Sequence, residues 1–204
     1  MRKKKKNSFP IICVLVFAVG IFLFAIYLLL SLGFKEKYDV TTDTNQYQNV
    51  IGEYAIAEYQ DKMGVSEEIF PPSVGSLNVK DFKMIHYDPF DKQFLAYLVV
   101  DYDNIYDYQK EMERLTDLGI DEYEGIFGVT GFDYYQLVAM YADSYQGFVY
   151  ALTDGKSHII YVELILCNYF YDFDYTKEIP KEYLPTGFDA TKNNPYRQEM
   201  MQEH

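Results

Sequence analysis

The chain has 204 residues, a formal net charge of −13 and an aromatic content rich in tyrosine, with 22 Tyr, 15 Phe and no Trp. Residues 1–37 hold seven of the 18 basic residues and one of the 31 acidic ones, which leaves a net charge of −19 in residues 38–204. So acidic a region repels phosphate backbones, and nucleic-acid binding is therefore not expected.

An uncharged, apolar run spans residues 10–33 and follows a hexapeptide with five Lys or Arg residues. As a helix the run would extend about 36 Å, which is enough to cross a hydrocarbon core about 30 Å thick. A cleavable signal peptide has a shorter apolar region of about 7–15 residues, and no small-x-small cleavage site follows this run. The sequence therefore predicts an uncleaved transmembrane anchor. The positive-inside bias places residues 1–9 in the cytoplasm and the bulk of the chain outside.

Beyond the anchor we expect a short stalk at 34–42, one extracytoplasmic domain at 43–188 and a flexible, polar tail at 189–204. A domain of this size can bury a single hydrophobic core. The only cysteines are Cys13, within the anchor, and Cys167, so the domain cannot contain an internal disulfide.

The periodicity of apolar residues predicts the order helix, strand, strand, helix and then three strands. Asp43 or Thr44 is suited to cap the first helix, because its side chain can accept a hydrogen bond from a free N–H group of the first turn. Asp103 or Asn104 is suited to cap the second helix in the same way. The expected ranges are 44–62 and 104–118 for the helices, and 79–87, 94–102, 134–142, 148–153 and 156–168 for the strands, with a further short strand near 126–129.

The second helix has the clearest signals. Gly119 follows it and suits the left-handed position that ends many helices. Its predicted buried stripe consists of Ile105, Tyr108, Met112 and Leu115.

This order of elements predicts an α+β domain, with a mostly antiparallel sheet of about five strands packed against two helices. It is similar to the order in cystatin-like, NTF2-like and ferredoxin-like domains. Chain order does not separate these three layouts, and a layout by itself implies no function.

Asp154-Gly155 predicts a two-residue hairpin loop between the last two strands. Thr153 would then face Lys156, and Val149 would face Ile160. In that register one side is an apolar core that includes His158, and the other is an aromatic face that two helices leave partly open. We expect this face to recognise sugar rings or a partner protein through Phe148, Tyr150, Tyr161 and Glu163.

Two acidic stretches place carboxylates two residues apart, which puts them on one side of an extended chain. Such pairs suit a hard cation such as Ca²⁺, although neither stretch fits an EF-hand loop. The candidate metal ligands are Asp101, Asp103, Asp172 and Asp174, of which Asp103 is also explained as a helix cap.

The sequence contains no catalytic signature. It has no nucleophile elbow, no phosphate-binding glycine loop and no histidine pair at metal-ligand spacing, and no cofactor is predicted. The sequence therefore favours a membrane-anchored binding or assembly module at the cell surface, whose partner is another anchored or envelope protein. The alternative is a surface hydrolase that uses carboxylates or a cation.

Overall fold

The computed structural model describes residues 17, 19–28, 37–51, 66–88, 93–166, 174–191 and 193–200. The chain divides into two compact units, Met1–Glu36 and Lys37–His204. In the first unit residues 17 and 19–28 are helical and carry exposed apolar side chains, such as Phe17 at 72% exposure and Tyr27 at 65%. Among the residues described, no helix combines the length and apolar character needed to cross a membrane.

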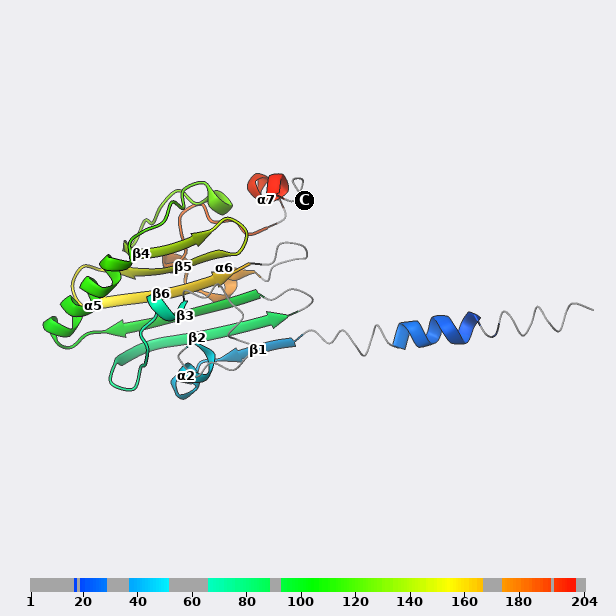
Figure 1. Cartoon of the computed structure of the whole chain (residues 1–204), viewed down its shortest axis with the longest axis horizontal. Coiled ribbons are helices and arrows are strands. Elements are labelled where there is room, and N and C mark those ends of the chain that lie inside the picture. The colour runs from blue at the N-terminus through cyan, green and yellow to red at the C-terminus, as the bar shows by residue number, and fades with distance from the viewer. Residues whose placement is uncertain are drawn as a thin grey trace, which may run out of the picture. The chain divides into compact units, whose positions relative to one another are not determined.

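The second unit is built on a six-stranded sheet with the strand order β1-β2-β3-β6-β5-β4 (Figure 1). All five neighbouring strand pairs are antiparallel. These observations confirm the predicted α+β class and the mostly antiparallel sheet, with one strand more than expected. The strands are β1 Lys37–Thr41, β2 Asn78–Asp88, β3 Gln93–Asp101, β4 Gln136–Asp143, β5 Gly147–Thr153 and β6 His158–Ile165.

The additional strand is β1, which lies in the segment expected to be a stalk, residues 34–42. It pairs with β2 along its whole length, with Val40 opposite Ile85. The stretch Lys-Tyr-Asp-Val-Thr is short and largely polar, so alternation alone does not distinguish it from a linker. The expected stalk therefore contains an edge strand of the sheet.

Helix α5, Ile105–Leu118, confirms the second predicted helix. Asn104 caps it, since its side chain accepts the N–H of Tyr106 at 2.9 Å, and Gly119 ends it with φ of 80°. Tyr108 and Leu115 are buried as predicted, and Met112 packs at the edge of the same cluster. Ile105 is 53% exposed, which corrects the prediction for the first residue of the stripe.

The other helical segments are short. Asp43 caps the first one as predicted, by accepting the N–H of Asn45, whereas residues 52–62 of that expected helix lie outside the described residues. The strand expected near 126–129 is instead a single turn of 3₁₀ helix. These segments are η1 Thr44–Gln46, α2 Tyr47–Val50, α4 Ser66–Ile69, η2 Ile126–Gly128, α6 Tyr175–Glu178, η3 Lys181–Tyr183 and α7 Pro195–Met200.

The register between β5 and β6 differs from the prediction. Val149 lies opposite Glu163, and Thr153 lies opposite Ile159, so the strands are offset by three residues from the expected pairing. The loop is longer than two residues because the Asp154 carboxylate accepts backbone N–H groups that a two-residue turn would not present to it. An offset by an odd number of residues moves each β6 side chain to the other face relative to β5.

Both faces of the sheet are covered. The α5 face carries Val149, Ala151, Ile159 and Tyr161, and α5, α2 and α4 bury it through Leu115, Val50 and Ile69 among others. The loop face carries Phe148, Tyr150, Ile160 and Val162. Mostly irregular segments cover this second face, and their buried side chains are Phe127, Val129, Tyr175, Ile179, Leu184 and Ala190.

The cover of the loop face includes the segment expected to be a flexible tail, residues 189–204. Asn194 and Arg197 are only 4% and 3% exposed, and Arg197 donates to the carbonyl oxygen of Ala190 at 2.5 Å. The guanidinium carbon of Arg197 also lies 5.9 Å from the centre of the Phe127 ring. Up to Met200 the described part of this segment therefore belongs to the folded domain, which corrects the prediction.

Two glycines let the chain just before this segment pass close to η2. Gly128 and Gly187 have φ of 80° and 82°, a region that side chains disfavour. A Cβ on Gly187 would lie only 2.4 Å from the carbonyl oxygen of Gly128. Phe127 itself has φ of 49° and is the one non-glycine residue with positive φ among those described.

The segment that follows α5 bonds to the outer edge of β4 around Met140. Met140 donates its N–H to the carbonyl of Gly119, and the Met140 carbonyl accepts the N–H of Asp121, both at 3.0 Å. The side chain of Asp121 accepts the N–H of Ala142 at 3.1 Å. The backbone groups of Met140 and the N–H of Ala142 are therefore satisfied on this edge without a further strand.

Candidate functional site

The residues predicted to form an open aromatic face do not lie together. Phe148 and Tyr150 are on the loop face, whereas Tyr161 and Glu163 are on the α5 face. All four are 0% exposed. This corrects the expectation, and the physical reason is the offset register combined with the irregular segments that cover the second face.

The buried tyrosines use their hydroxyls within the fold. Tyr161 donates to Glu111 on α5 at 2.7 Å and lies 2.9 Å from the hydroxyl of Tyr102, while Tyr150 donates to the carbonyl of Tyr183. Burial raises the pKa of Tyr161 well above its usual value, and the nearby Glu111 carboxylate raises it further. These side chains therefore hold α5 and η3 to the sheet.

The four predicted metal ligands are also separated. Asp174 caps α6 and forms an ion pair with Lys177 at 3.0 Å, and Asp172 lies outside the described residues. Only Asp101 and Asp103 line a common hollow. Within the described ranges, no three His, Cys, Asp or Glu side chains are arranged to hold a metal ion.

The hollow that contains Asp101 and Asp103 is the candidate site. It lies where β3 ends and β6 begins, and it is an open, mainly polar depression of about 540 Å³. Its polar groups come from three aspartates, a serine and a histidine, and two tyrosines supply aromatic surface. The lining residues are Asp101, Tyr102, Asp103, Tyr135, Asp154, Ser157 and His158.

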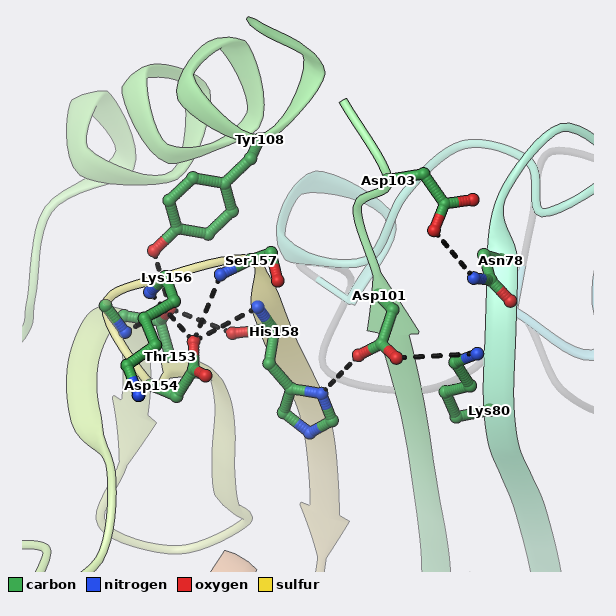
Figure 2. A network of polar contacts seen from close by, with 11 residues as sticks. Asn78, Lys80, Asp101, Asp103, Tyr108, Thr153, Asp154, Lys156, Ser157 and His158 are labelled. Atoms are coloured by element: carbon green, nitrogen blue, oxygen red, sulfur yellow. Dashed lines mark hydrogen bonds and ion pairs between the residues drawn. The ribbon is translucent and has the colours of Figure 1, made fainter. Parts of the chain in front are cut away.

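Asp101 stands at the centre of a polar network that joins three strands (Figure 2). One carboxylate oxygen lies 2.6 Å from Nδ1 of His158 on β6, and the other lies 3.5 Å from Nζ of Lys80 on β2. Lys80 is the extra residue of a bulge between Val79 and Asp81. The hydrogen bond from His158 lowers the pKa of the Asp101 carboxyl below its usual range, and Lys80 acts in the same direction.

The hydrogen bond to Asp101 orients the imidazole of His158. An ionised carboxylate only accepts, so Nδ1 carries a proton and Nε2 is the acceptor of the neutral ring. The ring of Tyr135 stacks on this imidazole, with centres 6.2 Å apart and planes inclined by 23°. The arrangement resembles a carboxylate–imidazole general base, but among the described residues no hydroxyl or thiol hydrogen-bonds to the ring.

The β5–β6 turn forms the next wall of the hollow (Figure 2). One oxygen of Asp154 accepts the backbone N–H groups of Lys156, Ser157 and His158 at 2.9–3.2 Å. Burial opposes the charged form of Asp154, yet these three donors lower the pKa of its carboxyl overall. The turn is fixed further by Tyr108 on α5, whose hydroxyl lies 2.8 Å from that of Thr153.

Sequence reasoning found Asp101 and Asp103 but assigned His158 to the core. His158 is instead partly exposed at the start of β6, with 24% of its side chain accessible. The available signal was Asp154 itself, since an aspartate followed by Gly-Lys-Ser-His can accept several N–H groups and open a longer loop. Tyr135 carried no comparable signal, because its place depends on the strand order.

Comparison with known proteins gives no relationship for this chain: no family model, no curated protein and no solved structure matches it.

Proposed function

We propose that this chain is a single-pass membrane protein, with residues 10–33 as its transmembrane helix and the Lys37–His204 unit outside the cytoplasm as a binding or assembly module at the cell surface. The single observation that carries the proposal is the uncharged run of 24 residues behind five basic ones. The exposed apolar side chains of helical residues 19–28 suit a lipid environment.

A binding role fits the chemistry of the extracytoplasmic unit. Its sheet is buried on both faces, so contacts with other molecules fall to loops, strand ends and the hollow at Asp101. That hollow offers acceptors and aromatic surface but no activated nucleophile among the described residues. Such features favour recognition of another molecule over covalent chemistry.

Site-directed cysteine labelling tests the topology. In a full-length Cys13→Ala, Cys167→Ala background, a cysteine is placed at Ser8 or at exposed Ser76. A membrane-impermeant maleimide added to intact cells should label the Ser76→Cys chain, and should label the Ser8→Cys chain only after lysis. The opposite pattern, or extraction of the chain from membranes by alkaline carbonate, would refute the proposal.

A hydrolase remains the second candidate, because one observation favours it. The 2.6 Å contact between His158 and Asp101 places an oriented imidazole in an open hollow with two further carboxylates. Release of reducing ends or free amines from purified envelope material would be measured for the wild-type chain with and without Ca²⁺. Activity that His158→Gln abolishes supports this candidate, and absence of turnover by the folded wild-type chain excludes it for that substrate.

A further inference from the structure

The turn between β5 and β6 contains the one Asp-Gly pair of the sequence, Asp154-Gly155, and the sequence has no Asn-Gly pair. An aspartate before glycine is prone to spontaneous isomerisation, because glycine has no side chain to shield its backbone nitrogen. Asp154 and Gly155 are both exposed, and no atom lies within 4 Å of the position that a Cβ on Gly155 would take. Burial therefore does not protect this pair from reaction.

The isomerisation needs two groups of the turn to be available. The backbone nitrogen of Gly155 attacks Cγ of the protonated Asp154 carboxyl group, and one water molecule is expelled as a five-membered succinimide ring closes. Addition of water then opens the ring at either carbonyl, which returns aspartate or gives isoaspartate, whose main chain runs through Cβ. Because the water lost is regained, the reaction needs no enzyme, oxidant or other reactant.

In the folded chain both reacting groups are held by hydrogen bonds. The N–H of Gly155 donates to Oγ1 of Thr153 at 3.1 Å. One oxygen of Asp154 accepts the backbone N–H groups of residues 156–158 (Figure 2). Partial burial works against the charged carboxylate, yet these donors lower the carboxyl pKa, so less of the reactive protonated acid is present.

Helix α5 fixes the hydroxyl that restrains the glycine nitrogen (Figure 2). The hydroxyl of Thr153 has a single proton, which it donates to the carbonyl oxygen of His158 at 2.9 Å. The hydroxyl of Tyr108, 2.8 Å away, is therefore the donor to Oγ1 of Thr153. Tyr108 is 7% exposed and Thr153 is 1% exposed, so the core sets both positions. The Gly155 nitrogen is thus tied to α5 through one shared oxygen atom.

We propose that Asp154 is a site of spontaneous isomerisation, and that the Thr153 hydroxyl, held by Tyr108 of α5, keeps it unreacted while the helix is packed on the sheet. Release of this hydroxyl frees the Gly155 nitrogen, and isoaspartate then forms. The inference stands apart from the binding role proposed above. Isoaspartate adds one methylene to the main chain of the turn and displaces the acceptor of three N–H groups, so a chain that has reacted does not rebuild the same turn.

The rate of isoaspartate formation tests the proposal. The full-length chain in phosphatidylcholine nanodiscs is incubated at neutral pH, and peptide mapping with electron-transfer fragmentation distinguishes isoaspartate from aspartate at Asp154. A blocked synthetic peptide of residues 148–160 gives the unrestrained rate. The folded chain should react at least about tenfold more slowly than the peptide, because several hydrogen bonds must open together.

Two variants release the nitrogen by different amounts. Thr153→Val removes the shared oxygen and should speed the reaction about fivefold, which corresponds to the loss of one hydrogen bond of about 1 kcal/mol. Tyr108→Phe leaves that oxygen in place but removes its link to α5, and should speed the reaction about twofold or more. Thermal unfolding shows whether each variant is folded, and Tyr108→Phe supplies the test if Thr153→Val does not fold.

Two matched controls keep or remove a hydroxyl without this effect. Thr153→Ser retains the hydroxyl, and Tyr106→Phe removes one from the same helix at a position 76% exposed. Both should react at the wild-type rate. Three outcomes would overturn the proposal: reaction of the folded wild-type chain as fast as the peptide, equal rates for Thr153→Val and Thr153→Ser, or equal rates for Tyr108→Phe and Tyr106→Phe.

Discussion

The two faces of the sheet are covered in different ways. On the α5 face, one amphipathic helix with a capped start supplies Tyr108 and Leu115 to the core, and short helices complete the cover. On the loop face, segments with little regular structure supply Phe127, Leu184 and Ala190, and they are held by side chains such as Arg197. Both covers leave the strand residues beneath them inaccessible to solvent.

The difference shows that a core face needs apolar volume and satisfied backbone groups, and that a periodic helix is only one source of them. The helical cover satisfies its backbone internally. The irregular cover depends on specific side chains, close glycine contacts and one left-handed phenylalanine. We therefore expect the loop face to be as important for stability as the α5 face, but to depend more on single residues.

The largest expected effect comes from truncating one core side chain on each face. Phe127→Ala should lower the free energy of unfolding by about 3–5 kcal/mol, and Leu115→Ala by about 2–5 kcal/mol, because each leaves a cavity. Leu118→Ala, at a position 41% exposed, should change it by less than about 0.5 kcal/mol. Urea unfolding followed by tyrosine fluorescence measures all three. A loss for Leu115→Ala alone would show that the irregular segments do not form a core.

A smaller loss of unfolding free energy is expected from adding a Cβ where Gly187 and Gly128 lie close together. Gly187→Ala combines an unfavourable φ with a contact to the Gly128 carbonyl, and should cost more than about 2 kcal/mol. Gly125→Ala is the matched control, since its φ is 90° but no atom lies within 4 Å of the added Cβ. It should cost about 1 kcal/mol from backbone strain alone. Equal thermal midpoints for the two variants would contradict the close crossing.

Arg197→Ala should lower the free energy of unfolding by about 1.5–3 kcal/mol, because it removes a charged hydrogen bond to the Ala190 carbonyl and the contact with the Phe127 ring. Glu199→Ala, at an exposed position in the same helix, should have an effect below about 0.5 kcal/mol. Hydrogen exchange should show faster opening of residues 125–131 in the Arg197 variant. If both variants behave like wild type, the C-terminal segment contributes nothing to the fold.

The smallest effect is on acid stability. The carboxyl pKa values of Asp101 and Asp154 are lowered in the folded chain, so their stabilisation is fully present above the unfolded value of about 3.9 and is lost as pH falls through the folded values. Asp154→Asn should therefore flatten the decrease in unfolding free energy below about pH 5, and its curve should converge with that of wild type near about pH 2. Parallel curves for the two chains would contradict the role of the turn.

Sequence reasoning succeeded where local rules act alone. Asn104, the apolar spacing at Tyr108 and Leu115, and Gly119 are all visible in the chain, and α5 has the predicted bounds to within a residue. Strands β2 and β3 were found for the same reason, since apolar and polar residues alternate over part of β2 and β3 is a continuous apolar run. Asp101 and Asp103 were singled out because their spacing is local as well.

The rest depends on contacts between distant residues. The β5–β6 register was mispredicted because the Asp154 side chain lengthens the turn, and that offset places Tyr150 and Tyr161 on opposite faces of the sheet. The segments that cover the loop face have no regular spacing of apolar residues, so the sequence does not reveal their role. His158 reaches Asp101 only because β3 and β6 are neighbours in the sheet, and chain order does not specify that pairing.

The bonding at the β4 edge has a consequence for self-association. Growth of a fibril by strand addition requires every molecule to offer two edges, one to the molecule before it and one to the molecule after it. With the backbone groups of Met140 already bonded to Gly119 and Asp121, β4 does not offer an uninterrupted edge. Addition of a strand along the whole of β4 would first have to break these bonds, so growth by strand addition is disfavoured on this side of the sheet.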